Sequence, residues 1–280
     1  PLYIAAPMIA LILSLISIAI IPFGGSWNLG GYNVPLQTTA FATGAGIQDI
    51  NIGLLVILGI TSIGVYGVAL SGWSSNSKYS LLGSLRASAQ LISYELALGL
   101  SLVGVLILAG SLSLRQIVDS QAGSVLNWYF LGGLQFIAFF IYITAAYAET
   151  NRIPFDLPEA ETELVAGYHT EYSAMKFAMF FMAEYCNMVT VACLATLLFF
   201  GGWHSPLEGL HIPVPAIWLM ISPLFWFFIK VFFFIFVYIW VRGTLPRFRY
   251  DQLMAFGWKF LLPLAIANIV VTSLIVGLKS

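Results

Sequence analysis

Carboxylates are the residues of this chain best suited to chemistry, and most of them lie in one short segment. The stretch from Ala148 to Tyr185 reads AETNRIPFDLPEAETELVAGYHTEYSAMKFAMFFMAEY and holds seven of the 12 acidic residues in a chain that is only 8% charged. They are Glu149, Asp156, Glu159, Glu161, Glu163, Glu171 and Glu184. Carboxylates packed this densely titrate as a coupled set. The segment is therefore suited to taking up and releasing protons, or to responding to a nearby change of charge.

A simpler interpretation accounts for part of the segment. Asp156 and Glu159 have the spacing of a capping box, with Pro158 in the first turn of a short helix. Glu159 and Glu161 would then be ordinary first-turn acids, stabilised by the helix dipole. This explains two or three carboxylates and leaves the other acids of the segment without an explanation.

Other ionisable residues stand in apolar surroundings. Glu95 lies within SYELALGLSL, where a charge costs about 3 kcal/mol on insertion scales. We expect Glu95 to face the bundle interior as a proton-relay group, continued by Glu149 and Glu184; the alternative is a structural hydrogen bond to a neighbouring helix. Lys230, within FFIKVFFFIF, is expected to form a buried pair with a carboxylate such as Glu184, or to carry protons itself. The alternative is a snorkelling side chain, which the depth of Lys230 disfavours. A lone histidine is usually structural, but His169 among acids would stay protonated near neutral pH.

The elements that position these groups are predicted to be membrane-spanning helices. The chain is 60% hydrophobic with a mean hydropathy of +0.94, and a spanning helix needs about 20 apolar residues. The runs are apolar on all sides rather than alternating, which argues against a membrane β-barrel. The sequence therefore predicts an all-α, polytopic transmembrane helix bundle, formed by residues 1–280 as a single integral membrane domain. Its seven expected spans are Leu2–Ile21, Ile47–Leu70, Ala87–Ala109, Trp128–Ala148, Phe177–Phe200, Ala216–Val241 and Trp258–Leu278.

Basic residues alternate between the loops and predict an orientation. Eight of them fall at one side of the bundle: Lys78, Arg86, Arg152, Lys176, Arg242, Arg247, Arg249 and Lys259. Only Arg115 and Lys279 fall at the other. By the positive-inside rule, the loop at 71–86, an acidic loop at 149–176 and a basic loop at 242–257 all face the cytoplasm. The compact loops favour a bacterial inner membrane. Arg247, Arg249 and Asp251 would be able to pair with the acidic loop.

Several classes of function receive no support. Cys186 and Cys193, seven residues apart on one helix, would lie about 10 Å apart, too far for a disulfide. No metal-ligand spacing or cofactor-attachment motif is present. A net charge of −1 gives no sign of nucleic-acid binding. The two halves show no convincing internal repeat, which counts modestly against a secondary transporter.

At this point the motifs themselves point to a family. AETNRIPFDLPEAETELVAGYHTEYS, the following MKFAMFFMAEY, FFGGW at 199–203 and RFRYDQLMAFGWK resemble the H subunit of proton-pumping NADH:quinone oxidoreductase, respiratory complex I. SYELALGLSL at 93–102 fits the same family, and the resemblance covers essentially the whole chain. The family has eight transmembrane helices, so the resemblance implies a first span ahead of Pro1.

The resemblance implies a function and assigns residues to it. Members of this family form the membrane side of the ubiquinone or menaquinone chamber and dock against peripheral-arm subunits that carry the flavin and iron–sulfur clusters. They bind none of these cofactors themselves, and they contact other membrane-arm subunits. Carried over by motif, the quinone-chamber loop contains Arg152, Asp156, Glu159, Glu161, Glu163, His169 and Glu171. The proton path contains Glu95, Glu149 and Glu184, and the second cytoplasmic loop contains Arg247, Arg249 and Asp251.

Three alternatives stay open from the sequence. One is the equivalent membrane subunit of an energy-converting hydrogenase or ferredoxin-driven complex, which would change the electron donor but little of this chain. Another is a stand-alone proton-coupled transporter, which would show uptake when isolated from any complex. The third is a structural anchor for the peripheral arm, in which neutral carboxylate substitutions would disturb assembly and leave turnover intact.

Overall fold

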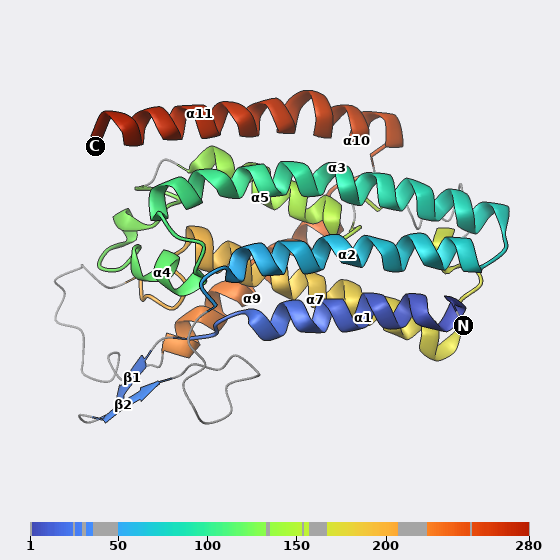
Figure 1. The fold of residues 1–280 in the computed structure, drawn as a ribbon, viewed down its shortest axis with the longest axis horizontal. Coiled ribbons are helices and arrows are strands. Elements are labelled where there is room, and N and C mark those ends of the chain that lie inside the picture. Colours follow the sequence, from blue (N-terminus) through green and yellow to red (C-terminus); the bar gives the residue numbers. More distant parts are fainter. Residues whose placement is uncertain are drawn as a thin grey trace.

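The protein is a bundle of long helices in the computed structural model, which describes residues 2–24, 26–29, 32–35, 50–132, 135–152, 154–156, 167–206, 223–246 and 248–279. The long helices run side by side along one axis (Figure 1). An apolar helix satisfies its own backbone hydrogen bonds, and this is the condition for crossing a membrane. Within the described ranges, six helices are long and apolar enough to do so, and a seventh apolar helix is shorter.

The elements follow the chain in a simple order. The long helices are α1 (Leu2–Ile20), α2 (Gly53–Ser74), α3 (Lys78–Ala109), α5 (Phe136–Glu149), α7 (Ala174–Phe199), α9 (Pro223–Thr244) and α11 (Leu262–Lys279). The short elements are β1 (Ser26–Leu29), β2 (Tyr32–Pro35), α4 (Leu114–Asp119), η1 (Val125–Asn127), η2 (Gly167–His169), α10 (Tyr250–Phe256) and the π-helical turn η3 (Gly257–Leu261). Strands β1 and β2 pair as an antiparallel hairpin with Trp27 opposite Val34.

Each of the seven predicted apolar spans overlaps one of the long helices, with changed ends. Helix α3 begins at Lys78 rather than Ala87 and is 32 residues long, because its polar first turns extend beyond the apolar run. The last span begins at Tyr250, since α10, η3 and α11 follow one another without a break. The predicted basic loop at 242–257 is consequently short, as residues 245–249 alone separate α9 from α10. The small hairpin was not predicted.

The links that carry charge meet at one end of the bundle, the end that holds the N-terminus and α10 in Figure 1. The Phe248 amide donates to the Pro154 carbonyl at 3.1 Å, and the rings of Phe155 and Phe248 stack with centroids 5.7 Å apart. Arg86 lies over the Tyr250 ring at 5.5 Å. The three segments predicted to share one side are therefore joined physically. We call this the charged end.

Polar side chains also tie helices together inside the bundle. Asn268 of α11 donates to the Gln135 side-chain oxygen at 2.9 Å, and Gln135 donates to Thr272 at 2.8 Å. Hydrogen bonds of this kind hold helices where the lipid supplies no hydrophobic driving force. The outward faces carry large apolar side chains instead, such as Phe232 and Phe236 of α9. Those faces are suited to contact with lipid or with other membrane subunits.

Candidate functional site

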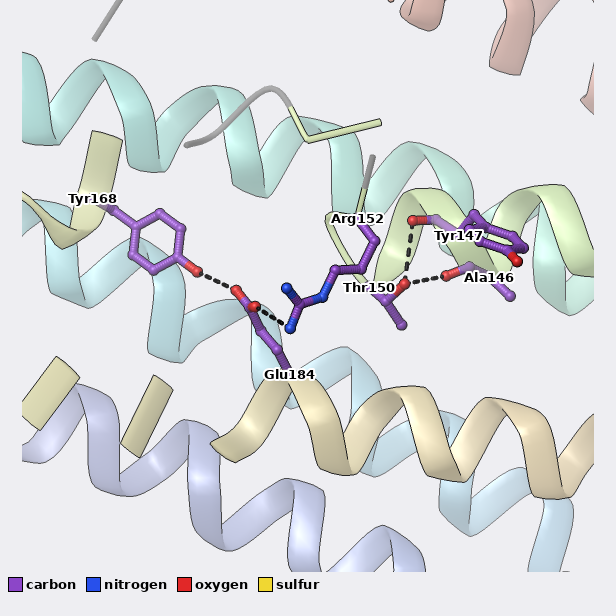
Figure 2. A network of polar contacts seen from close by, with 6 residues as sticks. All are labelled: Ala146, Tyr147, Thr150, Arg152, Tyr168 and Glu184. Atoms are coloured by element: carbon purple, nitrogen blue, oxygen red, sulfur yellow. Dashed lines mark hydrogen bonds and ion pairs between the residues drawn. The ribbon is translucent and has the colours of Figure 1, made fainter. Parts of the chain in front are cut away.

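The centre of the site is a buried ion pair near the charged end. Arg152 follows the end of α5, and its Nη2 atom lies 3.3 Å from Oε2 of Glu184 in the middle of α7. The Tyr168 hydroxyl donates to the other carboxylate oxygen of Glu184 at 3.1 Å (Figure 2). The Arg152 guanidinium also lies 4.5 Å from the ring centroid of Tyr185. The two charges are largely shielded from solvent, so each one depends on the other.

Two further carboxylates lie near this pair. Glu95 of α3 accepts a hydrogen bond from the Ser62 hydroxyl of α2. Glu149, the last residue of α5, is close enough to Glu95 for the two carboxylates to repel each other electrostatically. Three helices that are distant in sequence thus bring Glu95, Glu149 and Glu184 into one region. In a low-dielectric interior, neighbouring carboxylates of this kind share protons readily.

Small cavities adjoin two of these carboxylates, Glu149 and Glu184. One cavity of about 50 Å³ is lined by Glu149, Glu184, Asn187 and Tyr168, among others. A second, of about 10 Å³, is lined by Glu149 and Asn187 again, together with Thr61 and Thr190. A cavity needs roughly 10–15 Å³ and several polar partners to hold a water molecule. The first cavity meets that condition, and the second is about the size of one water.

Local packing explains how the acids are held in place. The Gln90 amide of α3 donates to the carbonyls of Ala148 and Phe155, both at 2.9 Å, and so fixes the chain on either side of Glu149 and Arg152. Gly83 of α3 allows η2 to approach closely, because a Cβ atom there would lie 2.8 Å from the Gly167 backbone. This contact positions Tyr168 next to Glu184.

His169 differs from the prediction that it stays protonated. Its side chain is 3% exposed and lies among the rings of Tyr168, Phe177, Phe180 and Phe181. Burial lowers the pKa of His169 to about 4, because an imidazolium in this apolar surrounding would be poorly solvated. The imidazole is therefore neutral near pH 7, and the expectation of a charged histidine is wrong.

Lys230 also differs from the prediction of a pair with Glu184, since its described contacts lie at the opposite end of α7. Its ammonium group donates to the carbonyls of Phe200, Gly202 and His204 at 2.7, 2.9 and 2.7 Å, and it lies 4.3 Å from the Trp128 ring centroid. These carbonyls follow the C-terminus of α7, about 24 Å along the helix from Glu184 at 1.5 Å per residue. The suggested pairing of Lys230 with Glu184 is wrong, and Lys230 caps the far end of α7 instead.

The remaining predicted residues occupy different positions at the charged end. Asp156 is buried, whereas Glu171 is exposed and its backbone carbonyl accepts a hydrogen bond from Tyr3. Arg249 and Asp251 form an exposed ion pair with each other at 3.7 Å. Four predicted residues lie outside the described part of the chain: Glu159, Glu161, Glu163 and Arg247. Among the described residues, no group of histidine, cysteine and acidic side chains could hold a metal ion.

Three polar residues of this site were missed in the sequence analysis: Ser62, Gln90 and Asn187. Each is an uncharged polar residue within an otherwise apolar helix. A polar group inside a membrane helix usually needs a partner within the bundle. That rule would have singled them out, had it been applied to neutral residues as well as to charged ones.

The fold and the site define a class: a polytopic integral membrane protein with ionisable groups buried inside its helix bundle. Comparison with known proteins specifies it further. A family model described as NADH dehydrogenase matches residues 1–273. Three similar proteins are H subunits of NADH-quinone oxidoreductases. The H 2 subunit of Koribacter versatilis is 69% identical over 280 residues, covering 100% of this chain and 78% of that protein. The H 2 subunit of Geobacter metallireducens is 56% identical, covering 99% and 76%, and the H 1 subunit of Solibacter usitatus is 48% identical, covering 99% and 80%.

The chain belongs to the family of NADH-quinone oxidoreductase H subunits. It is thus a membrane subunit of complex I, an oxidoreductase assembly, and the resemblance recognised in its motifs is confirmed.

Proposed function

We propose that this protein forms the membrane side of the quinone chamber and couples quinone reduction to proton movement through its buried carboxylates. One observation carries the proposal: Glu184 and Glu149 line one small cavity beside the ion pair, and Glu149 is within electrostatic reach of Glu95. Ionisable residues inside a membrane bundle are costly, and by default they mark a proton or ion pathway.

The chemistry of the path begins at the ion pair. Reduction of a quinone consumes protons and changes the charge at the chamber. Arg152 and Tyr168 hold Glu184 by both carboxylate oxygens, so a change of charge nearby alters how firmly that carboxylate keeps its proton. Glu149 shares a cavity with Glu184, and it lies within electrostatic reach of Glu95. A proton taken up or released at Glu184 can therefore pass along the three carboxylates.

The proposal includes partners and location. The acidic segment and residues 245–251 would provide the surface on which the peripheral-arm subunits dock, with their flavin and iron–sulfur clusters. The exposed outer faces of the helices would contact lipid and other membrane-arm subunits. The charged end would face the cytoplasm of a bacterial inner membrane, because basic residues concentrate there.

The test uses Glu95→Gln and Glu149→Gln in the whole complex purified from native membranes. NADH:quinone reductase activity and proton uptake are measured in the same liposomes. We expect quinone reduction with an uncoupler to stay near the wild-type level while protons moved per electron fall sharply. Pumping that remains at the wild-type ratio in both variants would show that these carboxylates are not a relay. Loss of assembly with normal turnover in the remaining complex would favour a structural anchor.

A further inference from the structure

A larger cavity lies at the charged end and is separate from the carboxylate site. It has a volume of about 580 Å³ and is lined mainly by aliphatic and aromatic side chains of α5, α9 and α10 and of the segments between them. The lining residues of α5 are Ile143, Thr144 and Tyr147, whereas the small polar cavities are lined by Tyr142 and Glu149. At 100° per residue these two sets face roughly opposite sides of α5. The large cavity therefore does not belong to the relay.

From this arrangement we infer that the cavity binds one acyl chain of an anionic phospholipid whose phosphate rests on the arginines beside it. The size of the cavity fits a bound small molecule, since ligand pockets measure roughly 300–1,000 Å³. Its lining offers few polar groups, chiefly Thr144, Tyr147 and Gln252. An apolar chain satisfies such a lining, and a polar ligand would not.

The position of the cavity places it at the level of lipid headgroups. Val241 and Leu245, at the end of α9, line it. Trp240 and Trp258 near this end expose their indole rings, at 63% and 49%. Exposed tryptophans concentrate where the hydrocarbon meets the headgroups of a bilayer. An acyl chain entering from this level would leave its headgroup at the surface.

Charge distinguishes an anionic lipid from a neutral one. Arg242 adjoins the lining residue Val241, and Arg249 adjoins the lining residue Phe248; both arginine side chains are exposed. The segment 242–259 contains four basic residues against one acid, Asp251. Basic side chains next to a membrane attract anionic headgroups, and basic pockets between helices bind them specifically.

The experiment uses the complex purified from membranes and a phosphatidylglycerol that carries a photoactivatable diazirine in its acyl chain. After irradiation, peptides are mapped by mass spectrometry. We expect the label on cavity residues such as Ile143, Leu245 and Phe248, and we expect unlabelled phosphatidylglycerol to compete better than phosphatidylcholine. Equal competition by phosphatidylcholine would overturn the anionic preference. Displacement by ubiquinone alone would assign the cavity to quinone, and absence of label would show that it takes no lipid.

Matched variants locate the site. Leu245→Trp fills the cavity and should reduce labelling at least tenfold, whereas Ile239→Trp, on an exposed position of the same helix that does not line the cavity, should leave labelling and activity unchanged. Arg242→Gln and Arg249→Gln should each weaken the preference for phosphatidylglycerol roughly fivefold. Full labelling of Leu245→Trp would overturn the assignment. Intact assembly on native gels is required of each variant, and the wild-type competition decides the matter if Leu245→Trp fails to assemble.

Discussion

Two cations at different levels along α7 are stabilised in different ways. Arg152 is paired with a carboxylate, Glu184, and flanked by the ring of Tyr185. Lys230 is held by three backbone carbonyls and flanked by the ring of Trp128. A carboxylate can take up a proton and lose its charge, but a carbonyl cannot. We call the region around Arg152 the switchable region, because Glu184 can lose its charge, and the three carbonyls around Lys230 the fixed anchor, because they accept hydrogen bonds at any pH.

The comparison predicts the largest effect in the switchable region. Glu184→Gln removes the negative charge and leaves the buried Arg152 guanidinium without this counter-charge. Breaking a buried ion pair in this way costs about 3–5 kcal/mol. We expect poor assembly of the variant on native gels and loss of proton pumping in the complex that does form.

An exposed acid provides the control for this prediction. Asp119 pairs with Arg115 at 3.9 Å on the surface of α4, with both side chains well exposed. Asp119→Asn should change stability by less than about 1 kcal/mol, because exposed ion pairs contribute little. Equal effects of Glu184→Gln and Asp119→Asn would contradict the contrast between a buried and an exposed pair.

The fixed anchor should show a smaller effect that does not depend on pH. Lys230→Met removes the donor of three hydrogen bonds, and the carbonyls at 200, 202 and 204 then rely on water. We expect a loss of about 2–4 kcal/mol, measured as a lower temperature of thermal inactivation of the complex. Lys78→Met, at the exposed start of α3, is the control. If Lys230→Met instead abolished pumping at normal stability, Lys230 would belong to the relay after all.

His169 offers a third prediction, on pH. Its pKa is lowered from 6.5 to about 4 by burial, so the opened segment binds a proton at a higher pH than the folded one. The folded segment that buries neutral His169 has its full stability above pH 6.5, and this stability is lost as the pH falls towards 4. At pH 5 the loss is about 2 kcal/mol. His169→Phe, which suits the surrounding rings, should remove this dependence.

Hydrogen exchange of peptides covering 167–173 measures this effect directly. Wild-type peptides should exchange faster at pH 5 than at pH 7 after correction for intrinsic rates, and the variant's peptides should be protected equally at both. Exchange in the wild type that is independent of pH would show that His169 does not titrate with opening.

The sequence was informative for the helices and for the charged residues of the site, and for different reasons. In a membrane, a long run that is apolar on all sides satisfies its backbone hydrogen bonds by forming a helix, so all seven spans could be predicted. Buried charges such as Glu95 and Glu184 are conspicuous in a chain with so few charges. The partner of a charge is a tertiary contact, however, and no local pattern connects Lys230 to carbonyls some 30 positions earlier. The charge state of His169 depends on burial in the same way.

Asn187 completes the comparison, because it lies in the switchable region and was found only in the structure. It lines both small cavities beside Glu149, one turn after Glu184 on α7. Its amide can both donate to and accept from a water between the two carboxylates. Asn187→Leu keeps the number of side-chain heavy atoms and removes that capacity, so we expect about a twofold fall in protons pumped per electron with stability changed by less than about 1 kcal/mol. Asn187→Gln retains the amide and should restore most of the ratio. Wild-type pumping by Asn187→Leu would mean that protons pass between Glu184 and Glu149 without it.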